Sequence, residues 1–386
     1  MRIEEARARI AGLTRLHAFI SVTGESGPGT VVAVKDLIDV RGVATTAGGR
    51  LLPSEPARED APVIRRLRER GCVMVGKTNL HEFAYGVTSE NVIHGDVLNP
   101  RDEARVAGGS SGGSAVAVAT DMCDWAIGTD TGGSIRIPAA LCGVVGIKPT
   151  MGLIETTGVV PLSPSLDTLG PLATDVSTAA AALELMSGRT GLVPGGAASL
   201  SALRLAVPAG WVTGLDGETE AAWRRVGDGL PEIPFPDRAR MNDVSNGIMM
   251  PEASHYHRHW VESCRHGYGD GAVLERLVRG LAIPAVDYLA ALRERDRVRS
   301  EAEAAMRGWD ALLLPATAEV APPIGAPHTR EPLARFTRAF NATGQPVVCI
   351  PAPASGLPVG IQVIGHIGDE AGVIRVAHAL ETAWRS

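Results

Sequence analysis

Short apolar runs alternate with segments of helical periodicity along most of this 386-residue chain. The runs TVVAV (30–34) and CVMVG (72–76) predict buried strands, and APVIRRLRERG (61–71) between them predicts a helix. A strand, a helix and a second strand in this order indicate a parallel βαβ unit. Ahead of this unit, residues 3–20 have the apolar spacing of an amphipathic helix.

The same alternation continues to the end of the chain. Residues 217–309 follow a mainly helical pattern, whereas residues 77–105 and 161–171 have the composition of loops. Further strands are expected at 125–127, 143–149, 203–210, 311–316, 346–352 and 357–365. Further helices are expected at 114–122, at 174–188 with Thr174 or Asp175 as the N-cap, and at 369–384. Without an internal repeat, the pattern predicts one α/β domain over residues 1–386 with a mixed sheet.

Composition and charge narrow the class of protein. The chain carries 37 basic and 43 acidic side chains, a net charge of −6, so no basic field favours nucleic acid or an anionic membrane. No apolar run approaches the ~18 residues of a membrane helix, and the charged N-terminus lacks the apolar core of a signal peptide. We therefore expect a cytoplasmic protein, with reduced thiols rather than disulfides at Cys72, Cys123, Cys142, Cys264 and Cys349.

Two clusters of serine and glycine are the strongest chemical signal. GGSSGGS (108–114) and GTDTGGS (128–134) lie on either side of a run of small apolar residues. Glycine at this density indicates positive φ angles or a close approach of the backbone to a ligand. The successive amides from Thr131 to Ser134 could form a concave group of N–H donors, which is typical of an oxyanion site. Together, the clusters predict an acyl-transfer centre.

Lysine usage adds a second signal. The chain contains 34 arginines but only three lysines, Lys35, Lys77 and Lys148, each beside an apolar segment. A chain that otherwise uses arginine for positive charge keeps lysine where a compact or deprotonatable amine is needed. Chance and codon bias are the alternative explanation. The residues alone do not indicate which of the three lysines would be catalytic.

Several long motifs resemble the amidase signature family of serine hydrolases. They are VVAVKDLIDVRGVATTAG, VMVGKTNLHEFAYG, GGSSGGSAVAVA, IGTDTGGSIRIPAALCGVVGIKPT and FNATGQPVVCIPAPASGLPVGIQVIG. The core of the resemblance covers about 30–175, and the region of about 215–310 is the least recognisable. The resemblance implies a large twisted mixed sheet covered on both faces by α-helices, as one domain.

The resemblance also implies a Ser–Ser–Lys triad, with Ser134 as the nucleophile, Ser110 as the bridging serine and Lys35 as the base. It implies a cis peptide bond between Gly109 and Ser110, and an oxyanion hole made by the backbone amides of Thr131, Gly132, Gly133 and Ser134. Burial against VVAV would lower the pKa of the lysine, so that the neutral amine draws a proton through Ser110 from Ser134. This chemistry needs no metal or cofactor. The implied partners are a small-molecule amide substrate and a second copy of the chain in a homodimer.

Other residues in or near these motifs could have either a functional or a structural role. Arg136 could bind a substrate carboxylate, but a buried ion pair with Asp130 is the favoured alternative. Tyr85 and Gly86 lie near the position where the family's acyl pocket is lined, and they could equally belong to the core. Structural roles are favoured for Ser111, Ser114, Lys77 and Lys148. Metal binding is not favoured for His255, His257 and His259, because only the first and last share a helix face.

These features predict an amidase that hydrolyses a small carboxamide through a serine acyl-enzyme. The glutaminase component (the A subunit) of a tRNA-dependent amidotransferase is the main alternative, although such chains typically place more residues before the base and after position 215. Biuret, urethane or ester hydrolysis would use the same machinery, and the motifs also resemble those of indole-acetamide and biuret-type hydrolases. A binding protein without activity is disfavoured, because all three triad positions are occupied.

Overall fold

The computed structural model describes residues 1–196, 198–327 and 329–385. Its strands are β1 (Phe19–Val22), β2 (Thr30–Lys35), β3 (Cys72–Thr78), β4 (Leu98–Asn99), β5 (Asp102–Val106), β6 (Trp125–Asp130), β7 (Val145–Lys148), β8 (Thr168–Ala173), β9 (Leu205–Pro208), β10 (Glu232–Ile233), β11 (Ala311–Pro315), β12 (Val347–Pro351) and β13 (Gly360–Ile364).

The α-helices are α1 (Ile3–Gly12), α2 (Pro62–Glu69), α3 (Gly112–Ala119), α4 (Arg136–Cys142), α5 (Val176–Ser187), α6 (Gly217–Gly227), α7 (Arg238–Ser263), α8 (Gly271–Leu281), α9 (Ala285–Ala305), α10 (Arg330–Ala334), α11 (Ala339–Thr343) and α12 (Glu370–Arg385). Short 3-10 helices are η1 (Thr14–Leu16), η2 (Glu82–Ala84), η3 (Leu200–Ala202) and η4 (Arg265–Gly267).

One mixed sheet contains strands from both the N-terminal and the C-terminal halves of the chain. Its 11 strands follow the order β1-β3-β2-β6-β8-β7-β12-β13-β11-β9-β10, and β4 and β5 form a separate pair. β2 and β3 are parallel with α2 between them in the chain, which confirms the predicted βαβ unit. β8 runs antiparallel to both of its neighbours. The predicted α/β class with a large mixed sheet is therefore confirmed.

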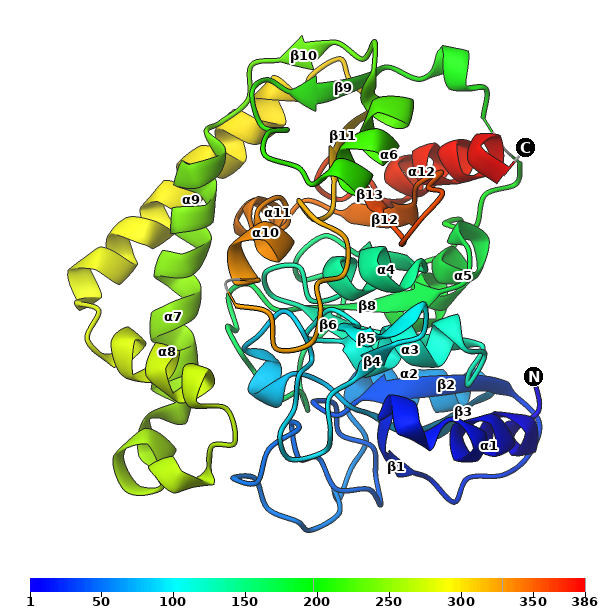
Figure 1. Cartoon of the computed structure of the whole chain (residues 1–386), viewed down its shortest axis with the longest axis vertical. Helices are drawn as coiled ribbons and strands as arrows, with labels where there is room; N and C mark the ends of the chain where they lie inside the picture. Colours follow the sequence, from blue (N-terminus) through cyan, green and yellow to red (C-terminus); the bar gives the residue numbers. More distant parts are fainter. Residues whose placement is uncertain (197, 328, 386) are drawn as a thin grey trace.

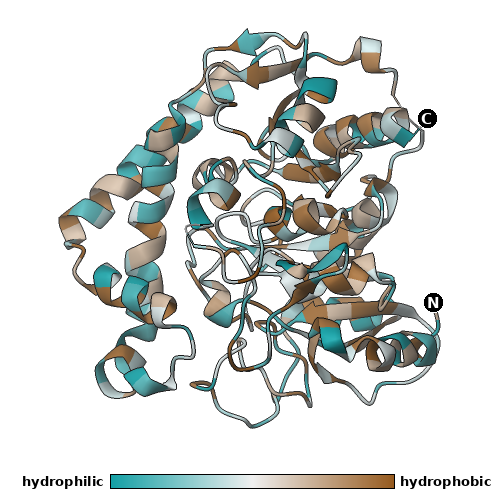
Figure 2. Ribbon diagram, in the orientation of Figure 1, coloured by the Kyte–Doolittle hydropathy of each residue, from teal (hydrophilic) through white to brown (hydrophobic). Residues whose placement is uncertain are grey.

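Alternation along the strands buries both faces of the sheet (Figure 1). In β2, Val32 and Val34 pack with the apolar residues of α2, α5 and α12, whereas Val31 and Ala33 pack with those of α1, α3 and α4. Apolar runs with this β-branched content are typical of strands that are covered on both sides. Figure 2 shows the same distribution, since the central strands are mostly brown.

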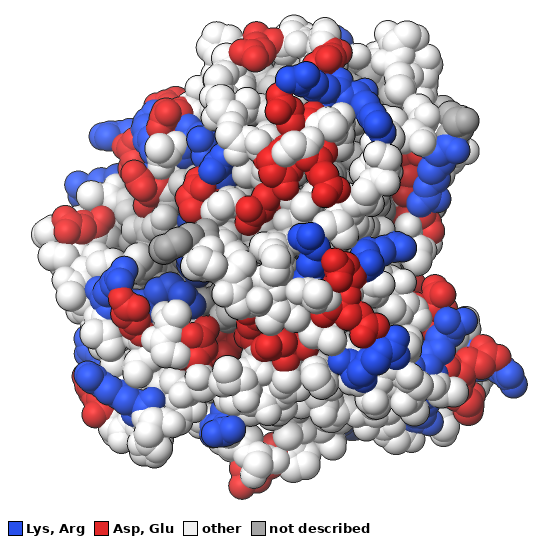
Figure 3. Space-filling model, in the orientation of Figure 1, with Lys and Arg blue, Asp and Glu red and all other residues white. Residues whose placement is uncertain are grey.

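A helical layer formed by α7, α8 and α9 packs on the β9–β11 end of the sheet. Met241, Ile248 and Val273 of this layer share an apolar cluster with Leu312 and Leu314 of β11. In Figure 1 the long helices α7 and α9 run along the side of the molecule opposite both termini. The face drawn in Figure 3 carries basic and acidic side chains intermixed over these helices and over the body.

Three of the expected elements differ from the structure. The expected loop over 77–105 contains η2, β4 and most of β5. The predicted helix over 3–20 ends at Gly12, and residues 19–22 instead pair antiparallel with β3 as an edge strand. The expected loop over 161–171 contains the start of β8, which lies between β6 and β7. The five cysteines are free thiols, as expected. Over the described residues, no helix combines the length and apolar character that crossing a bilayer requires.

Candidate active site

Lys35 lies at the end of β2 among three hydroxyl groups. Its Nζ donates to Ser110 Oγ at 2.7 Å, to Thr129 Oγ1 at 2.8 Å and to Ser111 Oγ at 2.9 Å. The side chain is fully buried, and no carboxylate forms an ion pair with it in the described part of the chain. Alternation along TVVAVK places Lys35 on the same face of the sheet as Val31 and Ala33, which is the face that α3 covers.

Burial changes the chemistry of this amine. Desolvation lowers the pKa of Lys35 from 10.5 to about 7, although the charges of Asp130 and Asp167 act in the opposite direction. A large fraction of the side chain is therefore neutral at physiological pH. A neutral amine surrounded by hydroxyl groups can accept a proton, which a normal surface lysine cannot do at this pH.

The two serine clusters meet at this amine. The peptide bond between Gly109 and Ser110 is cis, as predicted, and the Ser111 amide donates to the Ser134 carbonyl at 3.1 Å. Ser110 is fully buried, whereas Ser134 retains 6% exposure. Within the described residues, the Ser134 hydroxyl takes part in no hydrogen bond. The structure thus joins the Ser134 backbone to that of Ser111, whose neighbour Ser110 contacts Lys35, and leaves the Ser134 hydroxyl without a partner among the described residues.

The loop between β6 and Ser134 presents free amides. The amides of Thr131, Gly132 and Ser134 donate to no acceptor in the described chain, whereas the Gly133 amide donates to Asp130 Oδ1 at 2.8 Å. Gly133 has a φ of +127°, a conformation that glycine adopts readily and L-residues with a side chain rarely adopt. Of the four amides expected to bind an oxyanion, three are available and Gly133 has an internal partner.

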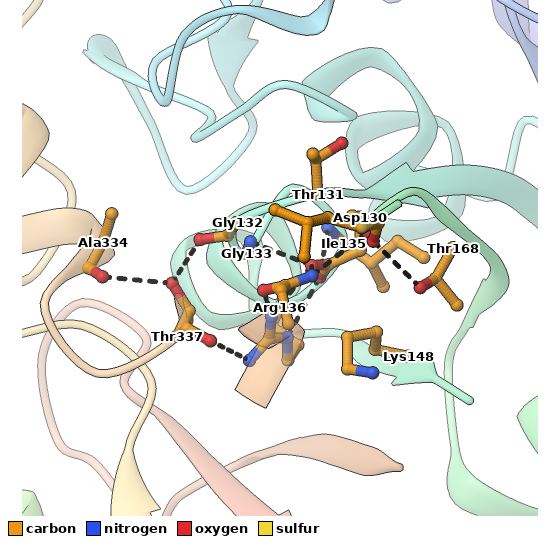
Figure 4. A network of polar contacts seen from close by, with 12 residues as sticks. Asp130, Thr131, Gly132, Gly133, Ile135, Arg136, Lys148, Thr168, Ala334 and Thr337 are labelled. Atoms are coloured by element: carbon orange, nitrogen blue, oxygen red, sulfur yellow. Dashed lines mark hydrogen bonds and ion pairs between the residues drawn. The ribbon is translucent and has the colours of Figure 1, made fainter. Parts of the chain in front are cut away.

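Asp130 and Arg136 bind each other (Figure 4). Arg136 Nη2 donates to Asp130 Oδ1 at 2.8 Å, and Nε donates to Oδ2 at 3.0 Å. Both side chains are fully buried. Although burial alone would raise the pKa of Asp130, the guanidinium of Arg136 holds it far below its usual range. The structure shows the ion pair that the sequence analysis favoured for these two residues.

Arg136 also ties the serine loop to a distant segment. Its Nη1 donates to the Thr337 carbonyl at 2.9 Å and to Gln362 Oε1 at 2.8 Å. Thr337 Oγ1 in turn donates to the Gly132 carbonyl at 2.7 Å (Figure 4). The segment just before α11 is therefore held against the loop that carries Ser134.

The other two lysines have different surroundings. Lys77 Nζ forms an ion pair with Asp36 Oδ1 at 2.8 Å, and both side chains are buried. Lys148 Nζ donates to the Pro149 carbonyl at 3.0 Å, and burial followed by repulsion from Arg136 lowers its pKa to about 7. Neither amine contacts a serine hydroxyl in the described structure. Geometry therefore distinguishes Lys35, which the residues alone did not.

Tyr85 and Gly86 follow η2 beside the site. The Tyr85 side chain is buried and its hydroxyl has no hydrogen-bond partner among the described residues. Gly86 packs against the ring of His81, which a β-carbon at Gly86 would approach to 2.0 Å. Gly86 thus has a packing reason for its identity, whereas Tyr85 carries an unsatisfied polar group into the interior.

Three further polar residues, Thr129, Asp167 and Ser111, belong to this site or to its borders, and Ser114 lies farther from the amine. Thr129 was missed from the sequence, although it contacts Lys35 as closely as the serines do. Asp167 accepts a hydrogen bond from Thr131 Oγ1 at 2.5 Å, and burial raises its pKa to about 6. Ser111, expected to be structural, donates to the Thr129 carbonyl at 3.1 Å while accepting from Lys35. Ser114 donates to the Ile127 carbonyl at 3.0 Å, away from the amine.

The histidine run at 255–259 does not form a metal centre in the structure. His257 is buried, and its Nδ1 shares a hydrogen bond with the Tyr268 hydroxyl at 2.9 Å. Over the described residues, no group of three histidine, cysteine or acidic side chains is arranged to hold a metal ion.

Comparison with known proteins identifies the family. The model of the family described as Amidase matches residues 2–208 and 217–374. The A subunit of glutamyl-tRNA(Gln) amidotransferase from Anaeromyxobacter sp. (strain K) is 37% identical, over 92% of this chain and 82% of that protein. The AtzE subunit of 1-carboxybiuret hydrolase from Pseudomonas sp. (strain ADP) is 36% identical, over 98% of this chain and 89% of that protein.

Solved structures agree with the sequence relatives. A crystal structure of an amidase has a TM-score of 0.91 and 35% identity, with 99% of this chain and 95% of that chain covered. The A subunit of glutamyl-tRNA(Gln) amidotransferase from Thermotoga maritima has a TM-score of 0.84 and 33% identity, with 98% and 90% covered. These matches extend along the whole fold and support an enzyme that hydrolyses carbon–nitrogen bonds. The chain therefore belongs to the amidase signature family.

Proposed function

We propose that this protein hydrolyses a small carboxamide to a carboxylate and ammonia or an amine, through an acyl-enzyme on Ser134. In this proposal Ser110 is the bridging hydroxyl, Lys35 is the base, and the free amides of Thr131, Gly132 and Ser134 bind the oxyanion. The observation that carries the proposal is the contact of 2.7 Å between the fully buried Lys35 Nζ and Ser110 Oγ.

Proton accounting around Lys35 supports this assignment. A neutral amine has two N–H donors and one lone pair, so it can donate to two of its three hydroxyl neighbours and must accept from the third. Ser111 uses its own proton on the Thr129 carbonyl, so it must be an acceptor toward Lys35. Ser110 Oγ and Thr129 Oγ1 have no other hydrogen-bond partner in the described chain, so either can give its proton to Lys35. We assign this role to Ser110 because the amide of its neighbour Ser111 binds the Ser134 carbonyl.

The reaction follows from this relay. The Ser134 proton moves to Ser110 Oγ, the Ser110 proton moves to Lys35 Nζ, and Ser134 Oγ forms a bond with the substrate carbonyl carbon. The carbonyl oxygen becomes an oxyanion that the free amides stabilise. The leaving nitrogen then takes a proton from Ser110, which recovers one from Lys35, and the C–N bond breaks. A water molecule then gives a proton through Ser110 to Lys35 and attacks the acyl carbon. The bond between that carbon and Ser134 Oγ breaks, Ser134 recovers its proton through the same relay, and the acid is released.

Labelling by a fluorophosphonate probe tests the nucleophile. Intact-protein mass spectrometry of the wild type should show one adduct, located on Ser134 by peptide mapping. Ser134→Ala should lose both the adduct and turnover, with an unchanged circular dichroism spectrum. Lys35→Met should lose at least about 1,000-fold in kcat/KM, whereas Lys148→Met, which removes an equally buried amine away from the serines, should lose less than about tenfold. Unlabelled wild-type protein, or full activity in Lys35→Met, would overturn the proposal.

A glutaminase that works inside a complex is the second candidate, since the relative that is 37% identical is the A subunit of an amidotransferase. Release of ammonia from glutamine only when a partner protein is added would favour it. Urea-type chemistry is the third, because the AtzE subunit of 1-carboxybiuret hydrolase is 36% identical. A panel of primary amides, anilides, ureas and esters separates these outcomes, and turnover of esters alone would overturn the amide assignment.

Light scattering of the same preparation tests the proposal that the protein is a homodimer. Fractionation of the source cells tests the proposal that it is cytoplasmic.

A further inference from the structure

Three successive carbonyl groups of the loop that carries Ser134 each accept a hydrogen bond. The donors and acceptors are Thr337 Oγ1 and Gly132 at 2.7 Å, the Ile137 amide and Gly133 at 2.7 Å, and the Ser111 amide and Ser134 at 3.1 Å. Of these three donors, Thr337 alone acts through its side chain, and it belongs to a segment 205 residues away from Gly132 in the chain.

The peptide unit between Gly132 and Gly133 is held at both ends. Its carbonyl oxygen accepts from Thr337 Oγ1, and its N–H donates to Asp130 Oδ1 at 2.8 Å. The oxygen and the hydrogen of a trans peptide unit point in opposite directions, so Thr337 and Asp130 together fix the plane of this unit. The N–H groups on either side of it belong to Gly132 and Ser134, two of the amides that we assign to the oxyanion.

The two glycines explain why this peptide unit needs to be held. Glycine has more accessible backbone conformations than any other residue, so a unit between two glycines turns easily unless hydrogen bonds fix it. Glycine is nevertheless required at position 133, because a β-carbon there would lie 2.3 Å from Thr337 Oγ1 and 2.7 Å from Thr337 Cβ. The close approach that brings the Thr337 hydroxyl to the loop therefore depends on a residue without a side chain.

The proton of the Thr337 hydroxyl is directed mainly at Gly132. A hydroxyl has one proton to donate, and Oγ1 lies 2.7 Å from the Gly132 carbonyl but 3.3 Å from the Ala334 carbonyl. Figure 4 shows the hydroxyl between these two carbonyl groups. Only the shorter contact has the length of a normal O–H···O hydrogen bond. Thr337 is therefore a donor to the loop, a role that serine can fill and that valine and alanine cannot.

Thr337 is itself anchored to the ion pair behind the loop. Its carbonyl accepts from Arg136 Nη1 at 2.9 Å, and Asn341, in the same segment, donates through Nδ2 to Asp130 Oδ1 at 2.8 Å. The side chains of Thr337 and Asn341 are both buried. A hydroxyl held in this way is preorganised, so it orients the loop before a substrate arrives and needs no rearrangement when negative charge develops.

We propose that Thr337 is a positioning residue for the oxyanion site, because its hydroxyl holds the Gly132–Gly133 peptide unit so that the amides of Gly132 and Ser134 converge on the substrate carbonyl oxygen. Thr337 neither contacts the substrate nor transfers a proton. Since the oxygen carries a full negative charge only near the transition state, loss of the hydroxyl should lower kcat and leave KM nearly unchanged. This inference rests on the proposed amidase function.

Substitutions at position 337 test the role of the hydroxyl. Thr337→Val keeps the shape of the side chain, and Thr337→Ala avoids crowding of the Gly132 carbonyl by a methyl group. Both should lower kcat for the best amide substrate by roughly 10- to 100-fold, with KM changed by less than about threefold. Thr337→Ser retains the donor and should keep kcat within about threefold of the wild type. An effect of serine as large as that of valine and alanine would overturn the inference.

Thr343 offers a matched control in the same part of the chain. Its side chain is fully buried in α11, and its hydroxyl donates to Gln345 Oε1 at 2.9 Å instead of to the serine loop. Thr343→Val removes a buried hydrogen bond without touching the loop, so kcat should stay within about threefold of the wild type. A loss of kcat as large as that of Thr337→Val would show that any buried hydroxyl of this segment has the same effect, and would overturn the inference.

A trifluoromethyl ketone with the acyl group of the best substrate tests the amides more directly. Addition of Ser134 Oγ to its carbonyl carbon leaves an oxyanion where the transition state has one. In Thr337→Val its inhibition constant should rise by about the factor by which kcat/KM falls, whereas that of the carboxylate product should change by less than about threefold. Equal changes for the ketone and the product would contradict a role in positioning the oxyanion site.

Hydrogen exchange measured by mass spectrometry separates failure of this inference from failure of the proposed function. It needs no catalysis, and the peptide that covers residues 128–136 should exchange at least about tenfold faster in Thr337→Val than in the wild type. Faster exchange without a loss of kcat would overturn the inference and leave the amidase proposal intact. A wild type that neither turns over an amide nor is labelled at Ser134 would contradict the amidase proposal, and the inference with it.

Discussion

Arg136 holds Asp130 in a two-point ion pair in the interior, with an Nη2–Oδ1 distance of 2.8 Å and an Nε–Oδ2 distance of 3.0 Å. The two residues lie on either side of Ser134 in the chain, and Asp130 is the strongest of the negative charges that raise the pKa of Lys35. By pairing with Asp130, Arg136 limits this effect, so the ion pair helps to keep the amine neutral. The same ion pair therefore affects both the stability of the loop that carries Ser134 and the pKa of Lys35.

Arg136→Gln should therefore affect both properties. The variant leaves a buried carboxylate without its partner, so the free energy of unfolding in urea should fall by about 3–5 kcal/mol. Because unpaired Asp130 favours the ammonium form of Lys35, the midpoint of the rise of kcat/KM with pH should move to higher pH. If the single variant does not fold, Asp130→Asn combined with Arg136→Gln removes both charges and should restore the midpoint to that of the wild type or below. A midpoint that does not move in either protein would contradict this link.

Thr129→Val is expected to move the same midpoint in the opposite direction. Valine has nearly the shape of threonine but removes the acceptor that lies 2.8 Å from Lys35 Nζ. Three acceptors favour the ammonium over the neutral amine, so losing one should lower the pKa of Lys35. The pH profile of kcat/KM should shift to lower pH, with a loss of maximal rate of less than about tenfold. The Ser114 hydroxyl is equally buried, but it contacts the Thr78 hydroxyl and the Ile127 carbonyl instead of Lys35. Ser114→Ala should therefore leave the midpoint unchanged.

Lys35 should also make stability depend on pH. Its folded pKa of about 7 lies below the ordinary value of 10.5, so the folded protein binds fewer protons than the unfolded chain between these values. Stability therefore rises as pH increases through this window, and below pH 7 the buried charge exerts its full penalty, of the order of 5 kcal/mol. Lys35→Met removes the penalty.

The measurement is urea unfolding of both proteins at pH 6 and pH 10. The hydroxyl groups that Lys35→Met leaves without a donor reduce its stability at both pH values, so they do not affect the comparison. Lys148 is present in both proteins and cancels as well. We expect the stability of the variant relative to the wild type to be greater at pH 6 than at pH 10. A difference that is the same at both pH values would show that Lys35 is not perturbed.

The sequence was informative where one segment determines its own environment. β2 and β3 were predicted because their apolar runs leave no alternative to a buried strand, and Asp175 caps α5 by accepting from the Thr178 amide, as its position suggested. β8 was missed because Gly170 and Pro171 both argue against a central strand. In the structure, Gly170 is explained by the close approach of the Ile147 carbonyl, which leaves no room for a side chain at this position of β8.

The site was predicted only in part, because some of its residues are determined by contacts between segments that are distant in the sequence. Thr129 was missed because the expected strand ended at 127, where glycine and threonine suggested a turn, whereas β6 continues to Asp130. Arg136 offered two roles from sequence, and only the packing of Asp130 against it decided between them.

The most direct test of the central claim is the rate at which a fluorophosphonate labels Ser134 as a function of pH. The probe has no ionisable group in the range used, and a single-turnover rate excludes product release. If neutral Lys35 activates Ser134, the second-order rate should rise about tenfold per pH unit below pH 7 and level off above pH 8, with a midpoint near the pKa of about 7. A rate that is flat from pH 5 to 9, or that rises with a midpoint near 10, would contradict the account.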